Sequence, residues 1–160
     1  MTGTYGGEFD RSRLAADLRL AEGLRLKPYR CTQGRLTIGY GRNLEDRGIT
    51  THEALFMLAN DIQTCTDELF RLFSWARDVG DVRCRVLVEC LFVLGLPRFL
   101  GFKRFLAAAQ AGDWAGAARE LEDSEWQTQA PARVRRLAAM IATGADAAGS
   151  VPVAAAPHSP

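Results

Sequence analysis

Apolar side chains recur at helical spacing close to the start of the chain. The positions with this spacing are Leu14, Ala15, Leu18 and Ala21. Asp10 or Ser12 can cap the helix that the spacing predicts, and Gly23 can end it. The pattern therefore predicts an N-terminal helix with Glu22 at its end, facing the segment that follows.

The pattern changes between residues 25 and 42. Glycine and proline interrupt the chain there, at Pro28, Gly34, Gly39 and Gly41. Between them, the run 36–40 is rich in residues that favour strands. We predict a small antiparallel sheet that turns at Gln33-Gly34, closed by the short link NLEDRG.

A mostly helical region is predicted from residue 50 onward. Thr50 and Glu53 have the spacing of a capping box, in which each residue caps the backbone of the other. The later run VLVECLFVLGL is apolar nearly all round except at Glu89, a pattern typical of the buried centre of a helical bundle. A polar residue in such a helix should have a partner or face a cleft.

Shorter helices are expected over 102–111, over 114–122 and over 131–143. Asp113 can cap the second of these helices, Pro131 suits the first position of the third, and Gly144 suits its end. One helix, a small sheet and a helical lobe make an α+β fold. We expect one domain over 1–144, with a sheet lobe over 24–48, a helical lobe over 50–144 and a cleft between them. The Ala/Pro/Ser-rich tail over 145–160 is predicted to be disordered.

Composition narrows the classes of partner. The chain has 160 residues, of which 48% are hydrophobic and 24% charged, and its net charge is +1. This charge gives no general reason to expect nucleic-acid binding. We expect no membrane span and no export segment, since no apolar run is long enough. The four cysteines lack the spacing of zinc ligands, so no metal or other cofactor is expected. Cys65, Cys84 and Cys90 are interpreted as small buried hydrophobic residues.

Three polar residues in the glycine-rich stretch suggest chemistry. Glycoside hydrolysis needs a protonated acid on one side of the scissile bond and a base or nucleophile on the other. Glu22 could be that acid if partial burial raises its pKa. Cys31 and Thr37 would lie on neighbouring strands, where a thiolate can serve as base or nucleophile and a hydroxyl can hold water. Spacing alone supports this weakly, because an isolated Glu usually lies on the surface.

The residues around these three strengthen the hypothesis. The stretch EGLRLKPYRCTQGRLTIGYG resembles the catalytic stretch of the T-even phage lysozymes and related phage endolysins, the muramidases of glycoside hydrolase family twenty-four. The family pattern is Glu, eight residues, Asp or Cys, five residues, Thr, and this chain has the Glu-Cys-Thr form. The resemblance continues in order through VLVECLFVLG, LGFKRFL, GDWAGAARELEDSEW and TQAPARVRRLAAMIATG.

The resemblance implies a lysozyme-like fold and hydrolysis of the β-1,4 bond between N-acetylmuramic acid and N-acetylglucosamine in peptidoglycan. Glu22 would be the proton donor, Cys31 would fill the position of the family's aspartate, and Thr37 would position water. Arg133 matches an arginine that pairs with the catalytic glutamate, and Phe92 matches an aromatic residue that lines the cleft. The resemblance also implies a monomeric endolysin for host lysis. It would stay in the host cytoplasm until a holin releases it to the cell wall, with no nucleic-acid or membrane partner.

Several features depart from the better-known family members. The loop between Arg42 and Thr50 is much shorter than in T-even lysozymes, and Arg42 stands where a histidine often occurs. On the helix predicted to be central, Glu89 and Val93 replace amide residues. Hydrogen bonding near the floor of the cleft is therefore expected to differ.

Other interpretations remain open at this level. A cysteine hydrolase would need His52 or His158 beside Cys31. An inactive peptidoglycan-binding module or a lytic transglycosylase would keep the same fold. Arg133, Arg135 and Arg136 could form a nucleic-acid patch, although a plain helix surface is the simpler interpretation for Arg135 and Arg136. Among the tryptophans, Trp114 is expected in the core and Trp126 at the border of the cleft.

Overall fold

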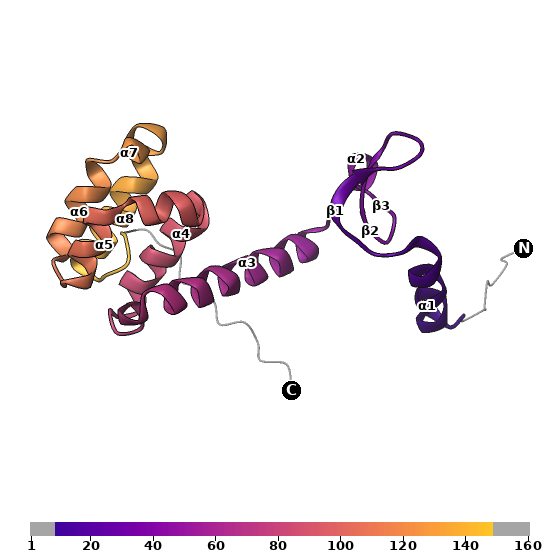
Figure 1. The fold of residues 1–160 in the computed structure, drawn as a ribbon, viewed down its shortest axis with the longest axis horizontal. Helices are drawn as coiled ribbons and strands as arrows, with labels where there is room; N and C mark the ends of the chain where they lie inside the picture. The colour runs from indigo at the N-terminus through magenta and orange to yellow at the C-terminus, as the bar shows by residue number, and fades with distance from the viewer. Residues whose placement is uncertain (1–8, 149–160) are drawn as a thin grey trace, which may run out of the picture. The chain divides into compact units, whose positions relative to one another are not determined.

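The chain folds as two compact units of an α+β protein. The computed structural model describes residues 9–148 (Figure 1), and the division between the units lies between Phe56 and Met57. Most of the predicted tail over 145–160, with His158, lies outside the described residues. Among the helices described, none has the length and the apolar content needed to cross a membrane.

The first unit holds a helix, a three-stranded antiparallel sheet and a short second helix. In chain order these elements are α1 (Arg11–Glu22), β1 (Arg25–Arg30), β2 (Leu36–Gly39), β3 (Arg42–Asn43) and α2 (Leu44–Arg47). The predicted caps of α1 are confirmed. The Asp10 side chain accepts a hydrogen bond from the backbone N–H of Arg13, and the N–H of Gly23 donates to the Arg19 carbonyl. No residue of α1 is buried within the unit.

The sheet turns where the sequence predicts. Tyr29 pairs with Thr37 across β1 and β2, and the backbone N–H of Gly34 closes the turn by donating to the Cys31 carbonyl over 2.8 Å. The link NLEDRG, predicted as a plain connection, contains α2 instead. Its cap is local, because the Asn43 side chain accepts from the backbone N–H of Asp46 at 3.0 Å.

The second unit is helical. It contains most of α3 (Thr51–Leu72), a 3₁₀ turn (Ser74–Arg77), α4 (Asp81–Gly101), α5 (Lys103–Gln110), α6 (Trp114–Glu122), α7 (Glu125–Gln129) and α8 (Pro131–Thr143). The capping box at the start of α3 is confirmed, since the Thr50 N–H donates to Glu53 and the Glu53 N–H donates to the Thr50 hydroxyl. A non-helical Gly95, with φ of 70°, kinks α4.

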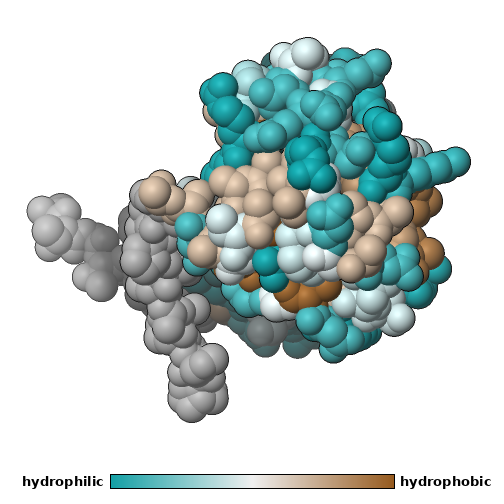
Figure 2. Space-filling model, turned by 90° about the vertical axis from the view of Figure 1, so that its left-hand side faces the viewer, coloured by the Kyte–Doolittle hydropathy of each residue, from teal (hydrophilic) through white to brown (hydrophobic). Residues whose placement is uncertain are grey.

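The core of this unit is formed mainly by α4, α5, α6 and α8. Its largest fully buried side chains include Phe99, Phe105, Leu87, Leu121 and Leu137. On the face in Figure 2, hydrophilic residues cover the upper part, and paler and hydrophobic residues cross the middle. The fully buried side chains form the apolar core that the hydrophobic effect requires, while some apolar residues stay on the surface.

Three sequence predictions for this core need correction. The run in α4 is not buried all round, because Phe92 and Val93 are exposed and Phe92 lines an open groove beside α3. Trp126, expected at the border of a cleft, lies on α7 and is buried in the core. Of the three cysteines predicted to be buried, Cys90 is buried, whereas Cys65 and Cys84 are only partly so.

Candidate active site

Glu22 is the last residue of α1 and lies against the turn between β2 and β3. A Cβ built on Gly41 would lie 3.1 Å from the Glu22 Oε2 and 3.8 Å from its Cγ. The sequence predicts partial burial of this acid, but the side chain is exposed within the first unit. The reason is that α1 contributes no buried residue there.

Cys31 and Thr37 come together at the hairpin. Cys31 directly follows β1, and Thr37 lies on β2 with only 4% of its surface exposed. The Thr37 hydroxyl donates to the Arg35 carbonyl over 3.0 Å and is also a hydrogen-bond partner of the Cys31 side chain. One hydroxyl hydrogen therefore has two acceptors within reach, the Arg35 oxygen and the Cys31 sulfur.

The hairpin turn lowers the pKa of the Cys31 thiol. The backbone amide of Gln33 is the main cause and the backbone amide of Arg35 is the second, because both stabilise a thiolate. Burial acts in the opposite direction, and the Thr37 hydroxyl lowers the pKa further. The arrangement thus makes the anionic form, which a base or nucleophile needs, easier to reach than in a cysteine without these amides.

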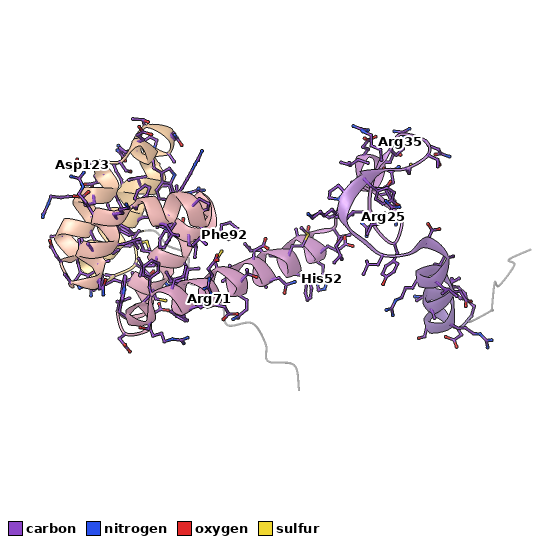
Figure 3. All side chains as sticks on the ribbon, in the orientation of Figure 1. Arg25, Arg35, His52, Arg71, Phe92 and Asp123 are labelled. Atoms are coloured by element: carbon purple, nitrogen blue, oxygen red, sulfur yellow. The ribbon has the colours of Figure 1, made fainter. Side chains whose placement is uncertain are left out.

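The short helix α2 supports this turn through side-chain contacts. Arg30 donates to the Gly34 carbonyl at 2.7 Å and lies 3.4 Å from Glu45, while Arg35 donates to Asp46 at 3.2 Å. Figure 3 labels Arg35 beside the loop of the hairpin. These contacts were missed at the sequence level. The spacing of Asn43 and Asp46, typical of an N-cap, was the available signal for α2.

The other two candidate residues lie in the second unit. Phe92 on α4 (labelled in Figure 3) is 42% exposed and lines a groove of about 410 Å³ together with residues of α3, among them Leu58 and Ile62. Arg133 on α8 lies 3.8 Å from Glu89, which also accepts a hydrogen bond from Arg136. Glu89 lines the same groove, so the predicted need for a partner or a cleft is confirmed. The pairing of Arg133 with Glu22 stays a prediction.

A comparison with protein families identifies the family of this chain. The family model described as phage lysozyme matches residues 19–140, a range that contains all five candidate residues. The chain belongs to the phage lysozyme family. This lysozyme is therefore a glycoside hydrolase, and its family implies peptidoglycan as the substrate.

Curated relatives agree with this assignment. Probable T4-type lysozyme 1 of Dictyostelium discoideum is 26% identical over 79% of this chain and 92% of the relative. Probable T4-type lysozyme 2 of the same organism is 27% identical over 83% and 95%, respectively. The pre-baseplate central spike protein Gp5 of Enterobacteria phage T4 is 28% identical over 82% of this lysozyme, but over only 28% of the spike protein.

The neighbours of Cys31 do not favour a cysteine–histidine pair. The groups that act on its thiol are backbone amides and the Thr37 hydroxyl, and none of them is a histidine. His52 is exposed in the first turn of α3. Within residues 9–148, no cluster of three or more His, Cys, Asp or Glu side chains is arranged to hold a metal ion.

Proposed function

We propose that this lysozyme cleaves the β-1,4 bond between N-acetylmuramic acid and N-acetylglucosamine, with Glu22, Cys31 and Thr37 as its catalytic residues. The observation that carries the proposal is the contact of Cys31 with Thr37, in a turn that lowers the pKa of the thiol. The family match over residues 19–140, which includes Glu22, supports the same assignment.

The reaction then proceeds by general acid and general base catalysis. Glu22 donates its proton to the glycosidic oxygen as the bond from that oxygen to the anomeric carbon breaks. A water molecule attacks the anomeric carbon and gives a proton to the Cys31 thiolate. The Thr37 hydroxyl, whose single hydrogen is shared between the Arg35 carbonyl and the Cys31 sulfur, accepts a hydrogen bond from the water through its oxygen and orients it.

The test is digestion of purified peptidoglycan followed by mass spectrometry of the glycan ends. Reducing N-acetylmuramic acid ends are expected. Anhydro ends would identify a lytic transglycosylase instead, and an absence of products would identify a binding module. Glu22→Gln is expected to lower kcat by about 10²- to 10⁴-fold, the usual contribution of a general acid. Asp17→Asn, on the exposed face of the same helix, is the matched control and should keep full activity.

Substitutions of Cys31 test the second role. Cys31→Asp should keep most activity, because a carboxylate supplies the same negative charge and the same basic atom. Cys31→Ser should lose most of it, since a serine hydroxyl stays protonated at neutral pH. A Cys31→Ser variant as fast as the parent would remove the thiol from the mechanism.

We further propose that this lysozyme is a monomeric endolysin that acts in host lysis after holin-dependent release. The match to phage lysozymes supports this biological role. Expression in a bacterium should cause lysis only when a holin is co-expressed. Lysis without a holin would contradict the proposed route, and a dimer in light scattering would contradict the proposed monomer.

A further inference from the structure

The position of Glu22 in the first unit depends on few contacts. Helix α1 has no buried residue in this unit, so no packed core holds its C-terminal turn. The Gly23 N–H caps the backbone there by donating to the Arg19 carbonyl over 3.3 Å. Side-chain contacts of this last turn therefore decide where the Glu22 carboxylate lies.

One such contact joins Arg19 to Tyr40. The Arg19 Nε donates to the Tyr40 hydroxyl at 3.2 Å, and the guanidinium carbon lies 5.7 Å from the centre of the Tyr40 ring. The ring of Tyr40 also borders a hollow lined by Ala16 and Leu20 of the same helix. A hydrogen bond and a cation–π contact thus act between the same two side chains.

The Arg19–Tyr40 contact is adjacent to the contact of Glu22 with Gly41. Arg19 and Glu22 are three residues apart on α1, so their side chains lie on one face of the helix. Tyr40 and Gly41 are consecutive in the turn that this face meets. The two contacts therefore lie side by side. The Arg19–Tyr40 contact restrains the last turn of α1, and this is the turn that places the Glu22 carboxylate against Gly41.

We propose that Arg19 and Tyr40 are positioning residues that hold the Glu22 carboxylate over Gly41 for proton donation. This inference rests on the proposed function in taking Glu22 as the acid. Proton transfer is sensitive to the distance and alignment of the acid, so a loosened Glu22 lowers kcat while substrate binding is kept.

The first test needs no substrate. One of the two Gly41 Hα atoms occupies the direction in which a Cβ would be attached, and this direction faces the Glu22 Cγ. NMR of the isotope-labelled parent protein should therefore show a nuclear Overhauser effect between that Gly41 Hα and the Glu22 Hγ atoms. Arg19→Ala and Tyr40→Leu should each weaken it by about threefold, in step with the fall in kcat expected below. Arg13→Ala, an exposed arginine on the same helix, should keep it. An Overhauser effect as strong as that of the parent in both Arg19→Ala and Tyr40→Leu would overturn the inference.

The second test measures steady-state kinetics on peptidoglycan. Arg19→Ala and Tyr40→Leu should each lower kcat by about threefold, the size of one exposed cation–π contact, with KM unchanged. Arg19→Lys should restore part of the loss because it keeps the positive charge and a donor. The double variant should be no slower than the slower single variant, because both changes break one contact.

The outcomes separate the inference from the proposed function. If Arg19→Ala and Tyr40→Leu weaken the Overhauser effect but keep the kcat of the control Arg13→Ala, the positioning role is overturned. If Glu22→Gln stays active, or the parent releases no reducing ends, the proposed function fails instead. In that case the Overhauser effect still decides whether Arg19 and Tyr40 hold Glu22 in place.

Discussion

Gly41 and Glu22 lie so close together that a Cβ added to Gly41 would be 3.1 Å from the Glu22 Oε2. Gly41 also has φ of 78°, in the left-handed region that favours glycine. A side chain at residue 41 would therefore strain the backbone and push against the candidate acid. Both effects point to glycine at this position.

Gly41→Ala is expected to lower both stability and activity. The backbone strain should cost about 1–2 kcal/mol in the free energy of unfolding. Gly39→Ala is the matched control, because Gly39 has φ of 68° and no neighbour within 4 Å of an added Cβ. Urea unfolding should show similar losses for the two variants, and kinetics should show a larger fall in kcat for Gly41→Ala. Equal kcat values in Gly41→Ala and Gly39→Ala would show that the contact of Gly41 with Glu22 does not affect catalysis.

The thiol of Cys31 should ionise at lower pH than the other thiols. Backbone amides, first that of Gln33, lower the pKa of Cys31, whereas burial and the nearby Glu68 raise the pKa of Cys65. Only the thiolate reacts with iodoacetamide, so the alkylation rate of Cys31 should rise at lower pH than that of Cys65. Peptide mass spectrometry over a pH series measures both rates in one sample.

Thr37→Val is the matched variant for this titration. It removes the hydroxyl that stabilises the thiolate, so the Cys31 alkylation curve should shift to higher pH while that of Cys65 stays in place. If the alkylation rate of Cys31 has its midpoint at the same pH as that of Cys65, or at a higher pH, the role of the hairpin amides is contradicted.

Glu53 should make the stability of the first unit depend on pH. The backbone and side chain of Thr50, followed by the Arg42 guanidinium, lower the pKa of Glu53 below its ordinary value near 4.5. A lowered folded-state pKa contributes stability above the unfolded-state value, and this contribution is lost as the pH falls through the folded-state value. Glu53→Gln should therefore destabilise the protein at neutral pH, with a difference that shrinks below about pH 4.

Thermal unfolding at several pH values measures this difference. Asp17→Asn serves as the control, because Asp17 is exposed and its removal leaves the Thr50 and Arg42 contacts intact. A constant difference between Glu53→Gln and the parent over pH 3–7 would contradict the linkage.

Features that depend on neighbours a few residues away were predictable from the sequence. The Asp10 and Asp113 caps, the Thr50–Glu53 capping box and the ends of helices at Gly23 and Gly144 are all present in the structure. Each is a hydrogen bond or backbone conformation formed within one turn of the chain, so the local sequence determines it. The spacing of Glu22, Cys31 and Thr37 was informative because they share one short segment.

Contacts between elements were decided only by the tertiary structure. The amides that lower the pKa of Cys31 act only when the hairpin closes, and Arg19 meets Tyr40 only when α1 approaches the sheet. Trp126 was misjudged for the same reason, because its burial depends on how α7 packs against α6 and α8. The sequence by itself determined the family, the main elements apart from the short helices α2 and α7, and the candidate residues. The tertiary structure decided which groups surround each residue, since burial and electrostatics depend on distances that no local pattern specifies.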